Sequence, residues 1–176
     1  MSKKPSPNPM SKKPWPDPMA RKPWPNPANY HSDVLAAATA EMNRILDQHP
    51  QLTDYGFGTY NDTFPGAPRE TRDAEFKRDR ETIQDDRSIA AFIATKHWLA
   101  DFPKIKTLNQ KGTSYGLKHI AEEEIGYVTN GVFIAAAIAE GFRVVCIDGG
   151  PNALLNISNK VWARRQALQN AGYLCV

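Results

Sequence analysis

Apolar residues recur at three- and four-residue intervals along most of the chain after residue 30, a spacing typical of amphipathic helices. Capping residues precede several of these segments, and glycine or proline follows them, as at natural helix boundaries. The pattern predicts helices over residues 32–49, 69–87, 88–101, 113–125, 131–140 and 158–170. Residues 50–68 are rich in glycine, proline and small polar residues, so we expect an irregular loop there.

Two apolar runs near the C-terminus predict one β-hairpin. Residues 142–147 and 153–157 flank the turn sequence Asp-Gly-Gly-Pro. Cys146 lies within the first run, so we expect a buried, unreactive thiol. The predicted fold class is therefore mainly α with one β-hairpin (α+β), in a single globular domain over residues 29–176.

Residues 113–158 follow the order helix, four-residue turn, helix and hairpin, which is the order of a helix-turn-helix with a wing. The second helix, residues 131–140, has no arginine, lysine or glutamine to bind base edges. Its residues are apolar all round, so we expect a buried core helix. The segment is helix-turn-helix-like in its order, and contacts with nucleic acid are expected from other parts of the chain.

The N-terminus is a tandem repeat. Residues 1–9, 10–18 and 19–27 are three similar units, and they hold nine of the 14 prolines. Proline lacks an amide donor and favours extended neighbours, so residues 1–28 are predicted to form a disordered polyproline II arm. Three interpretations stay open: a solvated extension, a peptide ligand whose Trp15 and Trp24 dock in an aromatic groove of a partner, and a phosphate-binding arm.

The net charge of +3 divides unevenly, because residues 1–27 carry +5 and the remaining residues −2. Between Asp101 and Glu122 there are 20 residues without a carboxylate. Lysines and hydroxyl groups before a helix N-terminus are the groups that an anion site needs, and Gly112 would let the backbone approach the anion. The predicted anion-binding residues are Lys104, Lys106, Lys111, Thr113, Ser114 and Lys118, with Arg164 and Arg165 at the flanks. The alternative is that these are ordinary solvated lysines.

Three short motifs carry a resemblance over residues 95–158. They are Asn109-x(3)-Thr-Ser-Tyr-Gly-Leu-Lys-His119, then Tyr127-Val-Thr-Asn-Gly-Val-Phe133, then Gly150-Pro-Asn-Ala-Leu-Leu-Asn156. The pattern resembles short uncharacterised proteins of bacterial plasmids, phages and integrated elements. The resemblance implies a bacterial accessory protein and brings no activity or catalytic residue with it.

Groups for catalysis are few. His119 shares a predicted helix face with Glu122 or Glu123, a spacing that fits an acid–base pair or two metal ligands but is common by chance. No nucleophile elbow, dinucleotide fingerprint or metal-binding helix motif occurs, and two cysteines cannot form a four-thiolate zinc site. The sequence therefore favours a protein without enzymatic activity, cofactor or metal.

The sequence predicts a cytoplasmic accessory protein of a mobile element that binds nucleic acid or another polyanion, mostly through backbone phosphates. No apolar run approaches the roughly 18–20 residues of a membrane span, so no membrane contact is expected. The alternative is a protein–protein interaction module, a binder or inhibitor of a host protein, that uses the Pro-Trp arm. A small hydrolase is the third possibility, and the oligomeric state stays open.

Overall fold

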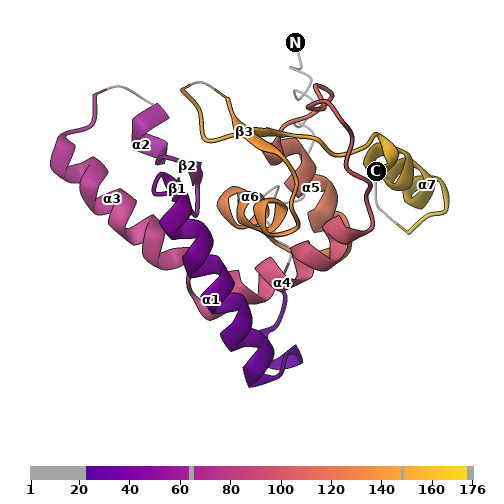
Figure 1. Ribbon diagram of the computed structural model, residues 1–176, viewed down its shortest axis with the longest axis horizontal. Coiled ribbons are helices and arrows are strands. Elements are labelled where there is room, and N and C mark those ends of the chain that lie inside the picture. Colours follow the sequence, from indigo (N-terminus) through magenta and orange to yellow (C-terminus); the bar gives the residue numbers. More distant parts are fainter. Residues whose placement is uncertain (1–22, 64–65, 148, 174–176) are drawn as a thin grey trace, which may run out of the picture.

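The computed structural model describes residues 23–63, 66–147 and 149–173 (Figure 1). A short 3-10 helix, η1 (Pro27–Asn29), precedes the first long helix. The elements that follow are α1 (Ser32–Gln48), β1 (Leu52–Thr53), β2 (Gly56–Phe57), α2 (Tyr60–Thr63), α3 (Arg69–Thr82), α4 (Asp86–Ala100), α5 (Ser114–Ile125), α6 (Asn130–Ala139), β3 (Val144–Cys146), β4 (Ala153–Leu155) and α7 (Lys160–Asn170). This architecture confirms the predicted fold class.

Helix α6 forms the centre of the core. Its residues from Asn130 to Ala137 are all buried, and it packs against α1, α4, α5 and the first hairpin. Figure 1 shows α6 in the middle of the molecule, with α3 and α7 at opposite ends. Because α6 contains no charged residue, burying all of its faces requires no desolvation of charge. Its composition therefore explains its central position. The prediction that residues 131–140 form a core helix is confirmed.

The predicted boundary between the third and fourth helices needs a correction. Helix α3 ends at Thr82 and not at residue 87, because Ile83 turns into the core and Asp85 then caps α4. The Ser88 N–H donates to the Asp85 carboxylate over 2.7 Å. A capping residue inside a run of charges was not distinguishable from the solvated helix face that surrounds it in the sequence.

The region expected to be an irregular loop contains a small antiparallel hairpin, β1–β2, and the short helix α2. The Thr53 hydroxyl donates to Gly58 O over 2.6 Å and so closes the turn. Two-residue strands are too short to show the alternation that predicts a strand. Phe57 packs against the core, whereas the Tyr60 side chain is exposed.

The second hairpin, β3–β4, is confirmed, with Val144 opposite Leu155 and Cys146 opposite Ala153. The expectation that Cys146 is buried is wrong, because its side chain is exposed. Burial decreases along β3 as the strand extends past α6 toward the hairpin loop (Figure 1). A thiol at the outer end of the hairpin therefore has no layer of the core above it.

The predicted arm also needs a correction at its C-terminal end. Residues 1–22 lie outside the described residues, but residues 23–27 pack on the body of the chain. Trp24 lies against Tyr127, with ring centroids 4.8 Å apart, and is partly buried on the core. Trp24, expected to bind a partner, thus binds its own chain, because Tyr127 and the helix junction offer it an apolar contact.

The N-terminus of α6 is held by a buried polar contact. The Asn130 side-chain amide donates to the carbonyl oxygens of Tyr55 and Pro151, and its oxygen accepts from the Ser114 hydroxyl over 2.8 Å. The next residue, Gly131, touches the first hairpin so closely that a Cβ there would lie 1.7 Å from Thr53 O. Both hairpins and α5 therefore meet at this point.

Gly131→Ala should destabilise the protein by about 3 kcal/mol or more, because the backbone of the first hairpin would have to move. Gly116→Ala is the matched control: Gly116 lies within α5, and a Cβ there would meet nothing within 4 Å. The control should stabilise by about 0.5 kcal/mol. Chemical denaturation of both variants measures the difference, and equal stabilities would contradict this packing.

Candidate functional site

The predicted anion-binding loop is a rigid extended segment. The Ile105 N–H donates to Asn156 O over 2.7 Å, and the Asn109 N–H donates to Leu155 O over 2.8 Å. Lys104 forms an isolated antiparallel bridge with Ile157. Residues 103–109 therefore lie along β4 and the residues after it like a third strand of the hairpin, which fixes the backbone from which their side chains project.

Two of the predicted lysines and one arginine form a cluster on this segment, named here the basic ribbon: Lys104, Lys106 and Arg143. Successive side chains of an extended segment alternate, so Lys104 and Lys106 share a face, and both are exposed. Arg143 lies beside Asn156 and donates from Nη2 to Lys106 O over 3.1 Å. Lys104 Nζ lies 4.8 Å from the Phe142 ring centroid.

Sequence reasoning missed Arg143, although a signal for it exists. From Gly141 to Val176 the sequence contains one acidic residue, Asp148. The stretch between Asp101 and Glu122, which has no carboxylate, packs against the stretch from Gly141 onward. Together the two stretches form a basic end of the molecule. Among the described residues, Lys104, Lys106, Lys111, Arg143 and Lys160 form no ion pair.

Lys111 lies apart from the ribbon, at a recess on α7. Its Nζ is 5.2 Å from the Trp162 ring centroid, and both side chains line the recess together with Arg165 and Gln166. A Cβ on Gly112 would lie 3.0 Å from Trp162 Cζ2. Gly112 therefore makes room for an indole ring, and not for an anion as expected.

Ser114 and Lys118 do not lie on the predicted surface, because both are buried. The Ser114 hydroxyl donates to Asn130 and accepts from the Ala153 N–H over 3.0 Å. The second hairpin thus covers the N-terminus of α5, where Thr113 is the N-cap residue without a side-chain capping bond. The helix N-terminus that the sequence suggested as an anion site is occupied by the protein itself.

Arg164 and Arg165 are exposed in part, but carboxylates neutralise them. Arg164 bridges Asp101 and Glu124 with two contacts of 2.6 Å each. The hydrogen bond with Asp101 is the largest cause that raises the pKa of the Arg164 guanidinium. Arg165 binds Glu123 through two nitrogens. The acidic end of α5 therefore removes both arginines from the set of unpaired cations.

The structure does bring His119 and Glu122 together. His119 Nδ1 lies 2.7 Å from Glu122 Oε2, and Lys118 Nζ lies 2.8 Å from Glu122 Oε1. Glu122 also accepts from the Val128 N–H, so the carboxylate is held on three sides. Within the described residues no third histidine, cysteine or carboxylate joins the pair as a metal ligand would. Glu122 thus orients the half-exposed imidazole of His119.

Asp54 is the most perturbed acid of the described chain. Burial raises the pKa of its carboxyl from 3.8 to about 6, while a hydrogen bond with the Thr129 side chain acts in the opposite direction. Asp79 and Asp85 raise this pKa further, and Lys118 lowers it. Asp54 Oδ1 is buried without a hydrogen-bond partner in the described residues. The carboxyl thus sits in a place that favours its protonated form.

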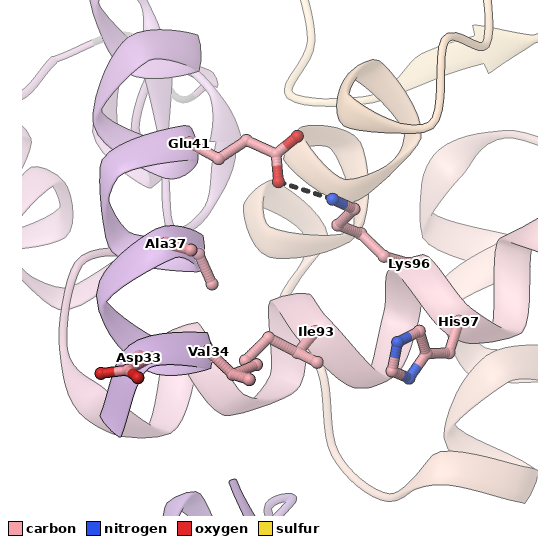
Figure 2. A pocket seen from close by; sticks show the side chains of 8 residues that line it. Asp33, Val34, Ala37, Glu41, Ile93, Lys96 and His97 are labelled. Carbon is pink, nitrogen blue, oxygen red and sulfur yellow. Dashed lines mark hydrogen bonds and ion pairs between the residues drawn. The ribbon is translucent and has the colours of Figure 1, made fainter. Parts of the chain in front are cut away.

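A separate groove runs between α1 and α4 (Figure 2). Figure 2 shows Lys96 of α4 reaching across to Glu41 of α1, and Lys96 also lies 3.9 Å from Glu140. The remaining lining is mostly apolar and includes Val34 and Ile93. None of the predicted site residues lines this groove, so it is not part of the basic surface.

Comparison with known proteins does not assign a family to the chain. No protein-family model, no curated protein and no solved structure matches it. The resemblance to proteins of bacterial mobile elements therefore stays a prediction. Among the described residues, no helix combines the length and the apolar character that crossing a membrane requires.

Lys118→Ala should cost about 3 kcal/mol of unfolding free energy, because it leaves Glu122 buried without its cation. Lys111→Ala is the control on the surface and should cost less than about 1 kcal/mol. Urea denaturation of both variants measures the difference. A solvated Lys118 would make the two variants equally stable.

Asp54→Asn should change the pH dependence of stability. Because folding raises the pKa of Asp54, its contribution is complete below about pH 3.8 and is lost as the pH rises through about 6. The asparagine does not titrate, so the variant should gain about 2.5 kcal/mol relative to wild type between about pH 4 and about pH 7.5. Denaturation curves over this range test it, and a difference independent of pH would contradict the raised pKa.

Proposed function

We propose that this protein binds the phosphate backbone of a nucleic acid through the basic ribbon, with Lys111 and Lys160 as further contacts. The observation that carries the proposal is the group of five cations without an ion pair among the described residues, within two stretches that contain almost no carboxylate. Lysine and arginine that neutralise phosphates release condensed counterions, which supplies the affinity.

The rigidity of the ribbon supports the proposal. Lys104 and Lys106 share one face of a segment whose backbone is hydrogen-bonded to residues 155–158. Cations on a fixed backbone lose less conformational freedom on binding than cations on a free loop. The Trp162 ring beside Lys111 adds a surface on which an unpaired base can stack.

The contacts expected of this surface position the protein and read little sequence. Helix α6, which takes the place of a recognition helix in the helix-turn-helix order, is buried. The three residues of the basic ribbon lie outside the helices, so none of them is carried by a recognition helix in the major groove. We therefore propose an accessory role in which binding depends on charge and strand geometry more than on base identity. The origin in a bacterial plasmid or phage belongs to the same proposal.

Lys104→Ala/Lys106→Ala should weaken binding to all sequences by a similar factor and reduce the salt slope by about one per lost phosphate contact. Fluorescence titration of labelled single- and double-stranded oligonucleotides at several salt concentrations measures both effects. Thermal unfolding confirms that the variant keeps its fold.

The matched control is Lys77→Ala/Arg87→Ala, which removes the same charge from exposed positions on α3 and the first turn of α4. This control should leave the slope unchanged, since its cations lie outside the basic ribbon. If both double variants change the slope equally, the ribbon is no site and only the net charge matters. If neither changes it, these lysines are solvated.

A further inference from the structure

The last repeat of the N-terminal arm is bound where α5 passes into α6. The Tyr127 N–H donates to Pro23 O over 3.0 Å. The Trp24 and Tyr127 rings meet edge-on, with centroids 4.8 Å apart and planes at 62°. Trp24 is partly buried against the hydrophobic core. Among the described residues, a backbone hydrogen bond and the indole ring thus contribute to holding the peptide.

Gly126 makes room for this peptide. It ends α5 with a φ of +89°, a conformation that side chains rarely adopt. A Cβ at this position would lie 2.4 Å from Pro23 O and 3.7 Å from Pro25 Cδ. The junction thus combines a donor, an aromatic face and a gap without a side chain, which together form a site for a Pro-Trp-Pro sequence.

The residue after this sequence also has a role. The Asn26 side chain accepts from the Ala28 N–H over 3.0 Å and so caps η1, which contacts α4. Aspartate offers the same acceptor oxygen as asparagine at such a position. The motif that the site binds is therefore Pro-Trp-Pro-Asx-Pro, where Asx is either residue.

The second repeat contains the same motif nine residues upstream, as Pro14-Trp-Pro-Asp-Pro18, whereas the first repeat has Ser6 in place of the tryptophan. We propose that Pro14–Pro18 binds the junction of its own chain in exchange with Pro23–Pro27. Each residue of the described part of the third repeat, Pro23–Pro27, has a counterpart in the second, with Asp17 in place of Asn26. This inference does not depend on the proposed function.

Exchange within one chain is physically accessible. Residues 19–29 would then form a loop, and closing a loop of this length costs little more than closing a shorter one. A short tether also keeps the second repeat at a local concentration of about millimolar. Tyr30 packs against the core, and the second repeat has Arg21 at the corresponding position, which explains why the third repeat occupies the site in this structure.

The exchange changes which cations the arm presents. With the third repeat bound, Arg21 and Lys22 directly precede the bound motif. With the second repeat bound, the same two cations lie inside the loop between Pro18 and Tyr30. The arm can therefore bind the site in two registers, through its second or its third repeat. The segment that precedes the bound repeat is one repeat shorter when the second repeat is bound.

Amide hydrogen exchange of Tyr127 in the full-length protein tests the proposal, because this N–H donates to a proline carbonyl of the bound repeat. Tryptophan is replaced by serine, the residue that stands in the first repeat. Trp15→Ser should leave the protection unchanged, and Trp24→Ser should reduce it by about tenfold or less. The double variant should lose a further factor of about thirty or more.

Protection of the Phe133 N–H, which donates to Thr129 O at the start of α6, reports whether each variant keeps its core. If Trp24→Ser exposes Tyr127 as fully as the double variant while Phe133 stays protected, the second repeat does not bind and the proposal is overturned. Unchanged protection in the double variant overturns it as well, since tryptophan would then not hold the peptide.

A peptide titration keeps the test independent of the stability of these variants. A synthetic peptide of residues 10–18, added to the full-length double variant, should restore the protection of Tyr127. The peptide of residues 1–9, with Ser6, is the control and should not. Failure of the first peptide overturns the proposal. Exchange at two protein concentrations separates the source: equal protection in Trp24→Ser supports intrachain binding, and protection that rises with concentration overturns it in favour of a second copy.

Discussion

The side-chain amide of Asn130 is the contact on which the rest of the arrangement depends. It joins both hairpins and α5 to the first turn of α6, through Tyr55, Pro151 and Ser114. Inside the protein these hydrogen bonds are strong and their loss is costly, because no water replaces them. Gly131 adds a steric condition, since its lack of a side chain lets the first hairpin approach the same turn. This one buried junction therefore holds both hairpins and α5 in position against the start of α6.

The junction also explains why α6, the second helix of the helix-turn-helix order, is not an exposed recognition helix. Once Asn130 is enclosed, the first turn of α6 faces protein on every side, and the apolar residues after it extend the core. The N-terminus of α5 is closed in the same way by Ser114 and Ala153. Neither helix start is open to a phosphate, so the proposed contact with an anion relies on side chains at the basic end. This is why the proposal rests on Lys104, Lys106 and Arg143.

The acidic end of α5 decides which cations remain available. Glu122, Glu123 and Glu124 follow one another in the sequence, yet each binds a different partner: Lys118, Arg165 and Arg164 in turn. Three of the eight cations in the two basic stretches are neutralised in this way. The other five form no ion pair among the described residues, and three of them, Lys104, Lys106 and Arg143, lie on backbone that is hydrogen-bonded in or along the second hairpin. Directly after these glutamates, Gly126 and Tyr127 bind the last repeat of the arm. Pro23 and Trp24 are therefore held against the body of the protein by noncovalent contacts.

The sequence by itself determined the long helices and the second hairpin, because their apolar spacing and capping residues act within a few positions along the chain. It also showed that residues 131–140 belong in the core and that the repeat contains a tryptophan motif. Only the tertiary structure decided that Ser114 and Lys118 are buried, that Cys146 is exposed and that Trp24 binds its own chain. Two of these depend on a partner far away in the sequence: Asn130 for Ser114 and Tyr127 for Trp24. Burial and pairing are set by those distant partners, and the local pattern of residues carries no information about which of them will meet.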